Sequence, residues 1–113
     1  MVNFTDEELK RINEFSTELF KGSDLYKKVV TNTCLVTCNL IKDVLGKKID
    51  RDLVHSRRII SYVLFQRGFS IKTIARMTGH TDRTIYTHIN SIKLDMDIDE
   101  RILNQVNSVL KTL

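Results

Sequence analysis

Arg83, Thr84 and Thr87 give one short stretch of the chain the side-chain chemistry that is needed to contact DNA. Arginine and threonine supply hydrogen-bond donors and acceptors that reach phosphates and, in the major groove, base edges. If the stretch is helical, its opposite side is a stripe of isoleucines: Ile85, Ile89 and Ile92. The spacing predicts a recognition helix that buries one face and presents the other to a duplex. The alternative is a solvated helix face without a ligand.

The residues before this stretch supply the rest of a helix-turn-helix. Ser70 can cap a first helix in which Ile71, Ile74 and Ala75 recur at helical spacing. Ala75 is small enough for a steep helix crossing, and Gly79 tolerates the positive φ that a tight turn requires. We therefore predict two helices joined by a short turn. The alternative is an ordinary helical hairpin in an all-α core with an incidental polar face.

The charge distribution favours the DNA-binding interpretation. The chain carries 18 Lys and Arg against 14 Asp and Glu, a net charge of +4. Residues 42–93 hold 11 basic and 4 acidic side chains, whereas residues 1–41 hold 5 and 6, and residues 94–113 hold 2 and 4. The positive charge is thus concentrated around the predicted motif, as a surface facing phosphates requires. An ordinary hairpin predicts no such bias.

Other charged residues around the motif are candidates for DNA contacts. Lys47, Lys48 and Arg51 form a basic connector, which either flanks the duplex or only solvates a loop. Asp82 is expected to cap the recognition helix, although its carboxylate could also accept a hydrogen bond from cytosine N4. The long cations beside the motif are candidates for phosphate contacts: Arg57, Arg58, Lys72 and Arg76.

Three stretches of the chain carry a resemblance to a known family. They are Ser56-Arg57-Arg58-Ile59-Ile60, Ser70 to Ala75, and Gly79-His80-Thr81-Asp82-Arg83-Thr84 ending at His88. Residues Leu53–Ile92, which contain them, resemble the DNA-binding domain that ends DnaA, the bacterial replication initiator. That domain has a Trp-repressor-like helix-turn-helix fold.

The resemblance implies roles for individual residues. Arg57 matches the arginine with which the family contacts the DNA backbone. The family's loop-and-helix motif, which supplies base and phosphate contacts, falls on His80 and Thr81 and on the base-reading positions Asp82, Arg83 and Thr84.

The departures from the family imply a different DNA target with the same docking mode. His55 stands where the family usually has a minor-groove arginine. His80 and Thr81 replace its second glycine and a basic residue, and Ile85 falls where it has a contacting threonine. The Gly-rich loop with Gly-Lys-Ser/Thr is missing, so we expect no nucleotide-hydrolysing module and no cofactor.

The chain as a whole predicts an all-α, compact bundle of about five to six helices in a single domain. Residues 1–45 are expected to form supporting helices, residues 47–93 the DnaA-like unit, and residues 97–113 a C-terminal helix. That last helix is expected to pack back on the first two helices, or alternatively to form a dimer seam.

The helix boundaries follow from caps and glycines. The segment Thr5–Glu8 is a capping box, followed by a helix that ends near Gly22. Ser23 or Asp24 caps a second helix that closes at Gly46. The remaining expected helices are Asp52 to Arg67, with Gly68 as its stop, the two helices of the motif, and a last one opened by Asp97-Ile98-Asp99-Glu100.

Apolar spacing predicts the buried side of each helix. Cys34 and Cys38 are expected to share a face as small buried residues in a reducing compartment. Tyr62 and Tyr86 are expected at the edge of the core, and His55 and His88 are either packed or functional. The expected inward side chains are Leu25, Val29, Val30, Cys34, Leu35, Cys38, Ile41, Val44 and Leu45, then Leu53, Ile59, Ile60, Val63 and Leu64, and finally Ile98, Ile102, Leu103, Val106, Val109, Leu110 and Leu113.

The remaining function classes receive little support. We find no Ser/His/Asp or Cys/His constellation, so we expect no enzyme, and the histidines show no zinc-type spacing. No apolar run approaches a membrane span and no leader opens the chain, so a cytoplasmic, nucleoid-associated protein is expected.

We therefore predict a sequence-preferring reader of double-stranded DNA, a small regulator of transcription or replication. A homodimer and a protein partner of the N-terminal helices are possible additions. The alternative function is a helical protein-interaction adaptor whose basic face meets an acidic partner.

Overall fold

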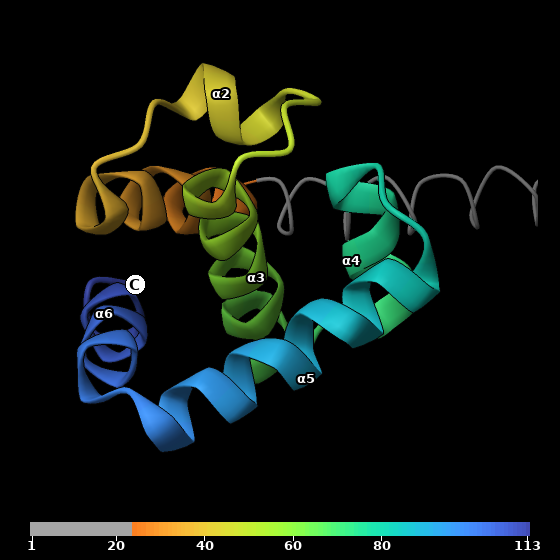
Figure 1. The fold of residues 1–113 in the computed structure, drawn as a ribbon. Helices are drawn as coiled ribbons and strands as arrows, with labels where there is room; N and C mark the ends of the chain where they lie inside the picture. The colour runs from red at the N-terminus through yellow and green to blue at the C-terminus, as the bar shows by residue number, and fades with distance from the viewer. Residues whose placement is uncertain (1–23) are drawn as a thin grey trace, which may run out of the picture.

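The computed structural model describes residues 24–113, and every regular element in this range is a helix (Figure 1). This confirms the predicted all-α fold. None of these helices has the length and apolar character needed to cross a membrane. The capping box and the helix expected before Gly22 lie outside the described residues. The elements are a helical segment over residues 24–37, α2 (Ile41–Leu45), α3 (Arg51–Gln66), α4 (Ile71–Thr78), α5 (Asp82–Ile98) and α6 (Glu100–Lys111).

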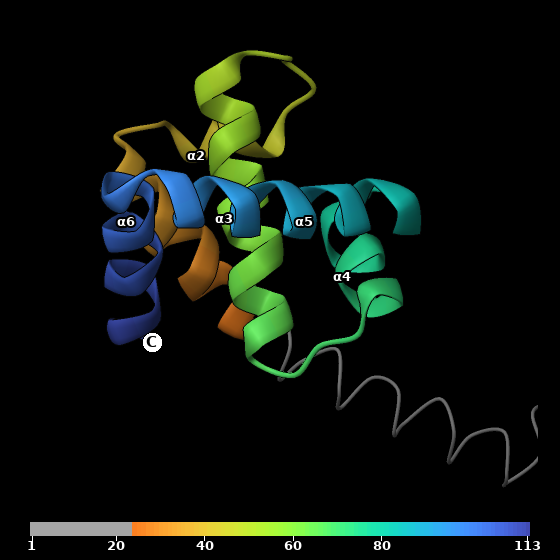
Figure 2. The same cartoon turned by 60° about the horizontal axis from the view of Figure 1, so that its bottom comes forward.

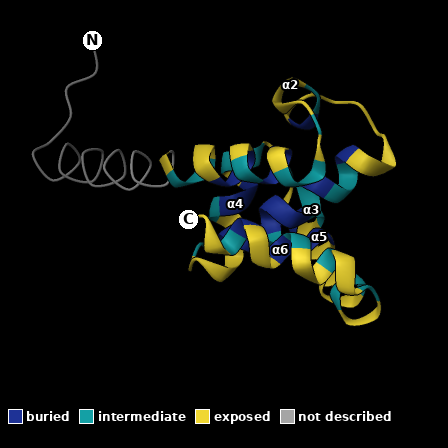
Figure 3. Ribbon diagram, turned by 90° about the vertical axis from the view of Figure 1, so that its left-hand side faces the viewer, coloured by how far each residue is buried: buried dark blue, intermediate teal, exposed yellow. Residues whose placement is uncertain are grey.

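Helix α3 is the centre of the bundle. It contacts α2, α4, α5 and α6. Helix α5 crosses α3, and α4 and α6 lie at opposite ends of α5 (Figure 2). The buried residues gather where the helices face the middle of the bundle (Figure 3). The inward residues predicted for α3 are all buried: Leu53, Ile59, Ile60, Val63 and Leu64.

The ends of α3 lie close to where the sequence places them. The Asp50 side chain caps its first turn by accepting from the Asp52 backbone N–H. Gly68 adopts a φ of 97°, and the N–H of Phe69 donates to the Leu64 carbonyl at 3.3 Å. This is a Schellman ending, which needs a residue that tolerates positive φ. Gly68 is therefore confirmed as the stop.

The predicted continuous helix from Asp24 to Gly46 is wrong. The helical segment ends at residue 37, and Cys38 follows with a φ of 59°, in the left-handed region. The chain then turns and starts again as the short helix α2, which Leu40 precedes in extended conformation. The apolar period runs on through the break, so periodicity alone does not reveal it.

A polar cluster between distant segments stabilises this break. The Asn39 side-chain amide donates to Ser56 Oγ at 2.7 Å and to the Asp52 carbonyl at 3.1 Å. Ser56 Oγ in turn donates to Thr37 Oγ1 at 2.9 Å. These bonds join the end of the helical segment to α3, and they have no counterpart in a local sequence pattern.

Several expected core residues in this part of the chain face solvent, and those after residue 37 do so because the helix breaks there. Cys34 is buried as predicted, but Cys38 is exposed, so the prediction that both cysteines are buried is wrong. Val29, Val30 and Val44 are buried as expected, and Leu25 is partly buried. The expected core residues that are instead exposed are Leu35, Ile41 and Leu45.

The C-terminal helix also begins later than predicted. Helix α5 continues to Ile98, and α6 starts at Glu100 with Asp99 as its N-cap, so the expected start at Asp97 is wrong. Ile98 is 83% exposed and Leu103 is 38% exposed, so the burial predicted for these two residues is wrong. Val106 and Val109 are buried as predicted. Helix α6 packs on α3 and α5, whereas we expected it on the first two helices, of which the first lies outside the described residues. A dimer seam on this helix, the alternative expectation, stays a prediction.

Candidate nucleic-acid interface

A short turn with a cap on each side connects α4 to α5. Ser70 Oγ accepts from the Thr73 backbone N–H at 3.2 Å and so caps α4. Gly79 ends α4 in the left-handed region, with a φ of 74°, and the His80 N–H donates to the Ala75 carbonyl at 3.0 Å. The roles predicted for Ser70 and Gly79 are confirmed, and together they set the direction in which α5 begins.

Thr81, rather than Asp82, caps α5. Thr81 Oγ1 accepts from the Thr84 backbone N–H at 3.2 Å, and the two hydroxyls lie 2.9 Å apart. The cap predicted at Asp82 is therefore wrong by one residue, because the turn is three residues long and both residue types suit a cap. Asp82 is the first residue of α5, where its charge interacts favourably with the helix dipole. Thr84 is half-buried and belongs to the cap.

The isoleucine stripe anchors α5. Ile85 and Ile92 are completely buried and Ile89 is 4% exposed, while α5 contacts both α3 and α4. Full burial of such side chains contributes about 1.5–3 kcal/mol each. The stripe is confirmed, and it fixes which side of α5 points away from the protein.

The side of α5 that faces solvent carries Arg83 and Thr87, as predicted, and also Tyr86 and Asn90. Tyr86 is 58% exposed, so its expected place at the core edge is wrong. Sequence reasoning missed Tyr86 and Asn90, although they lie three and seven residues after Arg83 and so share its side of a helix. We call Arg83, Tyr86, Thr87 and Asn90 the α5 outer face.

Three side chains of the α5 outer face, Arg83, Tyr86 and Asn90, have unused hydrogen-bonding groups within residues 24–113. Within residues 24–113, neither the Arg83 guanidinium nor the Asn90 amide has a hydrogen-bond or ion-pair partner. Thr87 differs, because its hydroxyl donates to the Arg83 carbonyl at 2.9 Å. Arg83 and Asn90 are therefore the members of this face that can each offer two hydrogen-bonding groups to one base, whereas Tyr86 offers a single hydroxyl.

The four predicted phosphate contacts lie in different surroundings. Lys72 and Arg76 are exposed on α4. Arg58 is half-buried and pairs with Asp95 of α5, with Nη1 and Oδ2 3.9 Å apart, so it joins α3 to α5. Arg57 is turned away from solvent and toward α2.

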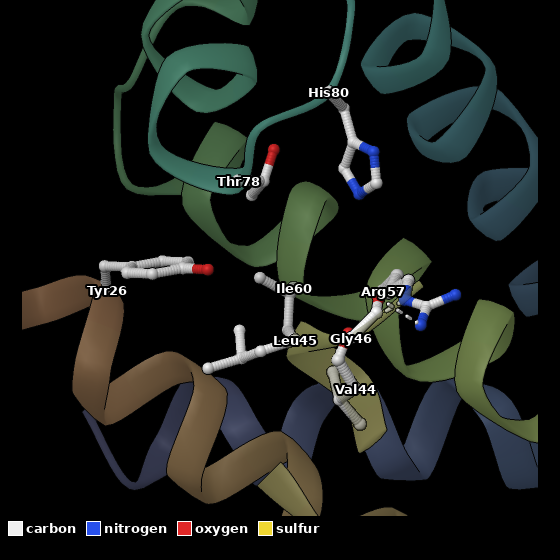
Figure 4. Close-up of a pocket in the computed structure, with 8 residues that line it drawn as sticks. All are labelled: Tyr26, Val44, Leu45, Gly46, Arg57, Ile60, Thr78 and His80. Atoms are coloured by element: carbon white, nitrogen blue, oxygen red, sulfur yellow. Dashed lines mark hydrogen bonds between the residues drawn. The ribbon is translucent and has the colours of Figure 1, made fainter. Parts of the chain in front are cut away.

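The Arg57 guanidinium holds the loop between α2 and α3 (Figure 4). Its Nε donates to the Val44 carbonyl at 2.8 Å, and its Nη1 donates to the Lys48 carbonyl at 2.6 Å. Its Nη2 donates to the carbonyls of Asp43 and Gly46 at 3.1 and 2.9 Å. Four of its five N–H donors are thus used on backbone acceptors. A phosphate contact through Arg57 would have to replace bonds that position α2.

Two histidines pack at the turn before α5. The His80 and His88 rings meet edge to face, with centroids 5.4 Å apart, and His88 Nδ1 lies 3.2 Å from Ser61 Oγ. Burial, with nearby Arg57, lowers the pKa of His80. Burial, with His80, Arg58 and Arg57 nearby, lowers the pKa of His88 to about 4. Both rings are therefore neutral at pH 7, and His88 is a packing residue.

His55 is a packing residue as well. Its Nε2 lies 2.9 Å from Gln105 Oε1, which links α3 to α6 in the half-buried region between them. The position that resembles a minor-groove arginine is therefore occupied by a side chain with a partner inside the bundle.

A small cavity lies between α2, α3 and the turn that precedes α5 (Figure 4). Its volume is about 40 Å³, which suits water rather than an organic cofactor. Among residues 24–113, no group of three or more His, Cys, Asp or Glu side chains could hold a metal ion. The cavity is lined by Tyr26, Val44, Leu45, Gly46, Arg57, Ile60, Thr78 and His80.

No protein-family model matches this chain, and no curated protein matches it either.

We predict that Arg57→Ala destabilises the protein. Hydrogen bonds to charged groups contribute about 1.5–3 kcal/mol each, and because these four share one guanidinium we expect a total loss of about 3 kcal/mol. Urea unfolding followed by circular dichroism measures this loss. The matched control is Arg67→Ala, which removes an exposed arginine at the end of the same helix. Equal free energies of unfolding for the two variants would contradict a stabilising role of the Arg57 hydrogen bonds.

The lowered His88 pKa predicts that acid destabilises the fold. Between pH 6.5 and about 4 the unfolded chain binds the His88 proton more readily than the folded chain does. The free energy of unfolding therefore falls as the pH is lowered through this window, by up to about 3 kcal/mol, and its full value is present above pH 6.5. His88→Gln should flatten most of this dependence, leaving a shallower slope from His80. If the free energy of unfolding of the variant falls with pH as steeply as that of the unmodified protein, His88 is not the source of the acid sensitivity.

Proposed function

We propose that this protein binds double-stranded DNA through the α5 outer face, as a sequence-preferring reader that regulates transcription or replication. The observation that carries the proposal is that Arg83 and Asn90, on one exposed side of a firmly anchored helix, have no partner within residues 24–113. A helix of this kind fits the major groove, where such groups find partners on base edges.

The anchoring of α5 supports the proposal on energetic grounds. Because the isoleucine stripe is buried and Thr81 caps the first turn, the outer face is ordered before any ligand arrives. A preorganised surface loses little conformational freedom on binding. The polar groups that DNA would need are therefore already arranged on a rigid element.

The charges around α5 also favour a polyanion. Residues 42–93 hold 11 basic side chains against 4 acidic ones. Two of the acidic side chains already interact with groups of the protein itself. Asp43 lies 4.0 Å from Lys48, and Asp50 caps α3. We assign phosphate contacts to Lys72 and Arg76 of α4, which the short turn connects to α5.

In this proposal Arg57 and Arg58 of α3 support the DNA-binding surface without contacting DNA themselves. Arg57 positions α2 and its loop, and Arg58 fastens α3 to α5 through Asp95. The DnaA-like docking mode is retained as part of the proposal, with a different target, because His55 is engaged with Gln105. Thr81, Asp82 and Thr84 then shape the start of the recognition helix, and Arg83 and Thr87 face the bases.

A second candidate, a protein-interaction adaptor, has one observation in its favour. Apolar side chains around α2 are exposed beside Lys42, Lys47 and Lys48, among them Leu40 at 69% and Ile49 at 93%. Such a surface suits an acidic partner with apolar contacts. Binding to an isolated DNA duplex distinguishes the two functions, since only the DNA reader binds such a duplex with an affinity that depends strongly on salt.

We predict that Arg83→Ala weakens binding to a preferred duplex by about 1–3 kcal/mol and reduces the difference from random DNA. Fluorescence anisotropy of a labelled duplex measures both, after selection of the preferred site from a random pool. The affinity should also fall with salt, with log K decreasing by about 0.9 per phosphate contact for each unit of log salt concentration.

The control for this experiment is again Arg67→Ala, which removes the same charge away from α5. Equal losses for the two arginine variants on every sequence would show that Arg83 contributes only charge. Failure of the unmodified protein to bind any duplex at low salt would exclude the proposed function.

A further inference from the structure

We propose that Asn90 reads an adenine in the target, about two base pairs from a guanine that Arg83 reads. This inference rests on the proposed function and assigns to it a class of DNA sequence. Neither the position-by-position resemblance to DnaA nor the apolar pattern of α5 singles out Asn90.

The side-chain chemistry of the two residues selects the bases. Asparagine has one donor group and one acceptor on the same planar amide, which matches N7 and the N6 amino group of adenine. Arginine has only donors and matches the two acceptors of guanine, O6 and N7. Because both side chains are exposed and unpartnered within residues 24–113, each can make such a two-bond contact without breaking an existing one.

The helix geometry sets the spacing of the two bases. Seven residues advance about 10.5 Å along an α-helix and bring Asn90 back to within about 20° of the Arg83 direction. Base pairs rise about 3.4 Å along the duplex axis, but the major groove runs obliquely to that axis, so a helix lying along the groove floor places these side chains about two base pairs apart. Thr87 lies between them, and its methyl group suits a thymine methyl at an intervening position.

The character of α5 changes after Asn90, which limits the contact to its first half. The next residues on this side of the helix are Leu94, 65% exposed, then Asp97, and then Ile98, 83% exposed. A carboxylate is repelled by phosphates, and two large aliphatic groups offer no hydrogen bonds to base edges. Asn90 is thus the last polar side chain of α5 that is directed like Arg83 before this acidic and apolar end.

The test compares the sites selected from a random duplex pool by the unmodified protein, by Asn90→Ala and by Asn107→Ala. Asn107 is an exposed asparagine on α6 and serves as the matched control. We expect the unmodified protein and the control to select a guanine and an adenine about two base pairs apart. Asn90→Ala should lose its preference at the adenine alone, by about 5- to 150-fold.

A modified base tests the same contact without any variant. Replacing the selected adenine by 7-deazaadenine removes the N7 acceptor and should weaken binding of the unmodified protein by about 2- to 12-fold, the value of one hydrogen bond. The same replacement should not change binding by Asn90→Ala.

Different failures lead to different conclusions. If Asn90→Ala keeps the preference at every position while the protein still selects a site, the assignment of Asn90 is overturned and the DNA-binding proposal stands. If the unmodified protein binds no duplex, both are overturned. An effect of 7-deazaadenine that is equal in the presence and absence of Asn90 also overturns the assignment.

Discussion

The burial of Ile85, Ile89 and Ile92 is the constraint on which the rest of this structure depends. These side chains lock α5 against α3 and α4 and thereby determine its rotation about its own axis. Once that rotation is set, the residues that point outward follow from helix geometry alone. An isoleucine lost from the stripe would leave a cavity and free the helix to turn, so packing and the candidate DNA surface cannot be separated. The caps at Ser70 and Thr81 add to this constraint by fixing where each helix of the motif starts.

Polar contacts between distant segments form the second level of organisation. The Arg57 guanidinium binds four backbone carbonyls around α2, while Asn39 and Ser56 join the end of the helical segment to α3. These bonds satisfy backbone acceptors in a region too short and irregular to satisfy its own. They also explain why an arginine beside a basic motif serves the fold: its planar, many-donor group is the side chain best suited to collect several carbonyls.

The sequence was informative wherever structure is decided locally. The isoleucine stripe, the Ser70 cap, and the glycine turns at Gly68 and Gly79 were all predicted, because each follows from helix periodicity or from a residue's own backbone preference. The break at Cys38 was not, since it depends on partners in α3 that periodicity does not show. The cap was assigned to Asp82 instead of Thr81 because neighbouring residues of equal capping ability cannot be ranked without the turn length. Tyr86 was expected at the core edge because aromatic side chains usually lie there, and Asn90 carries no charge that marks it as a DNA contact. The engagement of Arg57 depends on a loop whose path no local pattern predicts.

In the proposed complex, the outer side of α5 lies in a DNA groove while the α2 region does not. Amide chemical shifts of the isotope-labelled protein, followed by NMR as a selected duplex is added, test this claim residue by residue. The account predicts that the largest changes occur at Arg83, Tyr86, Thr87 and Asn90, with smaller ones at Lys72 and Arg76, and that Leu94, Ile98 and the exposed residues of α2 stay unchanged. Changes concentrated in α2 and the following loop, with α5 unaffected, would contradict it.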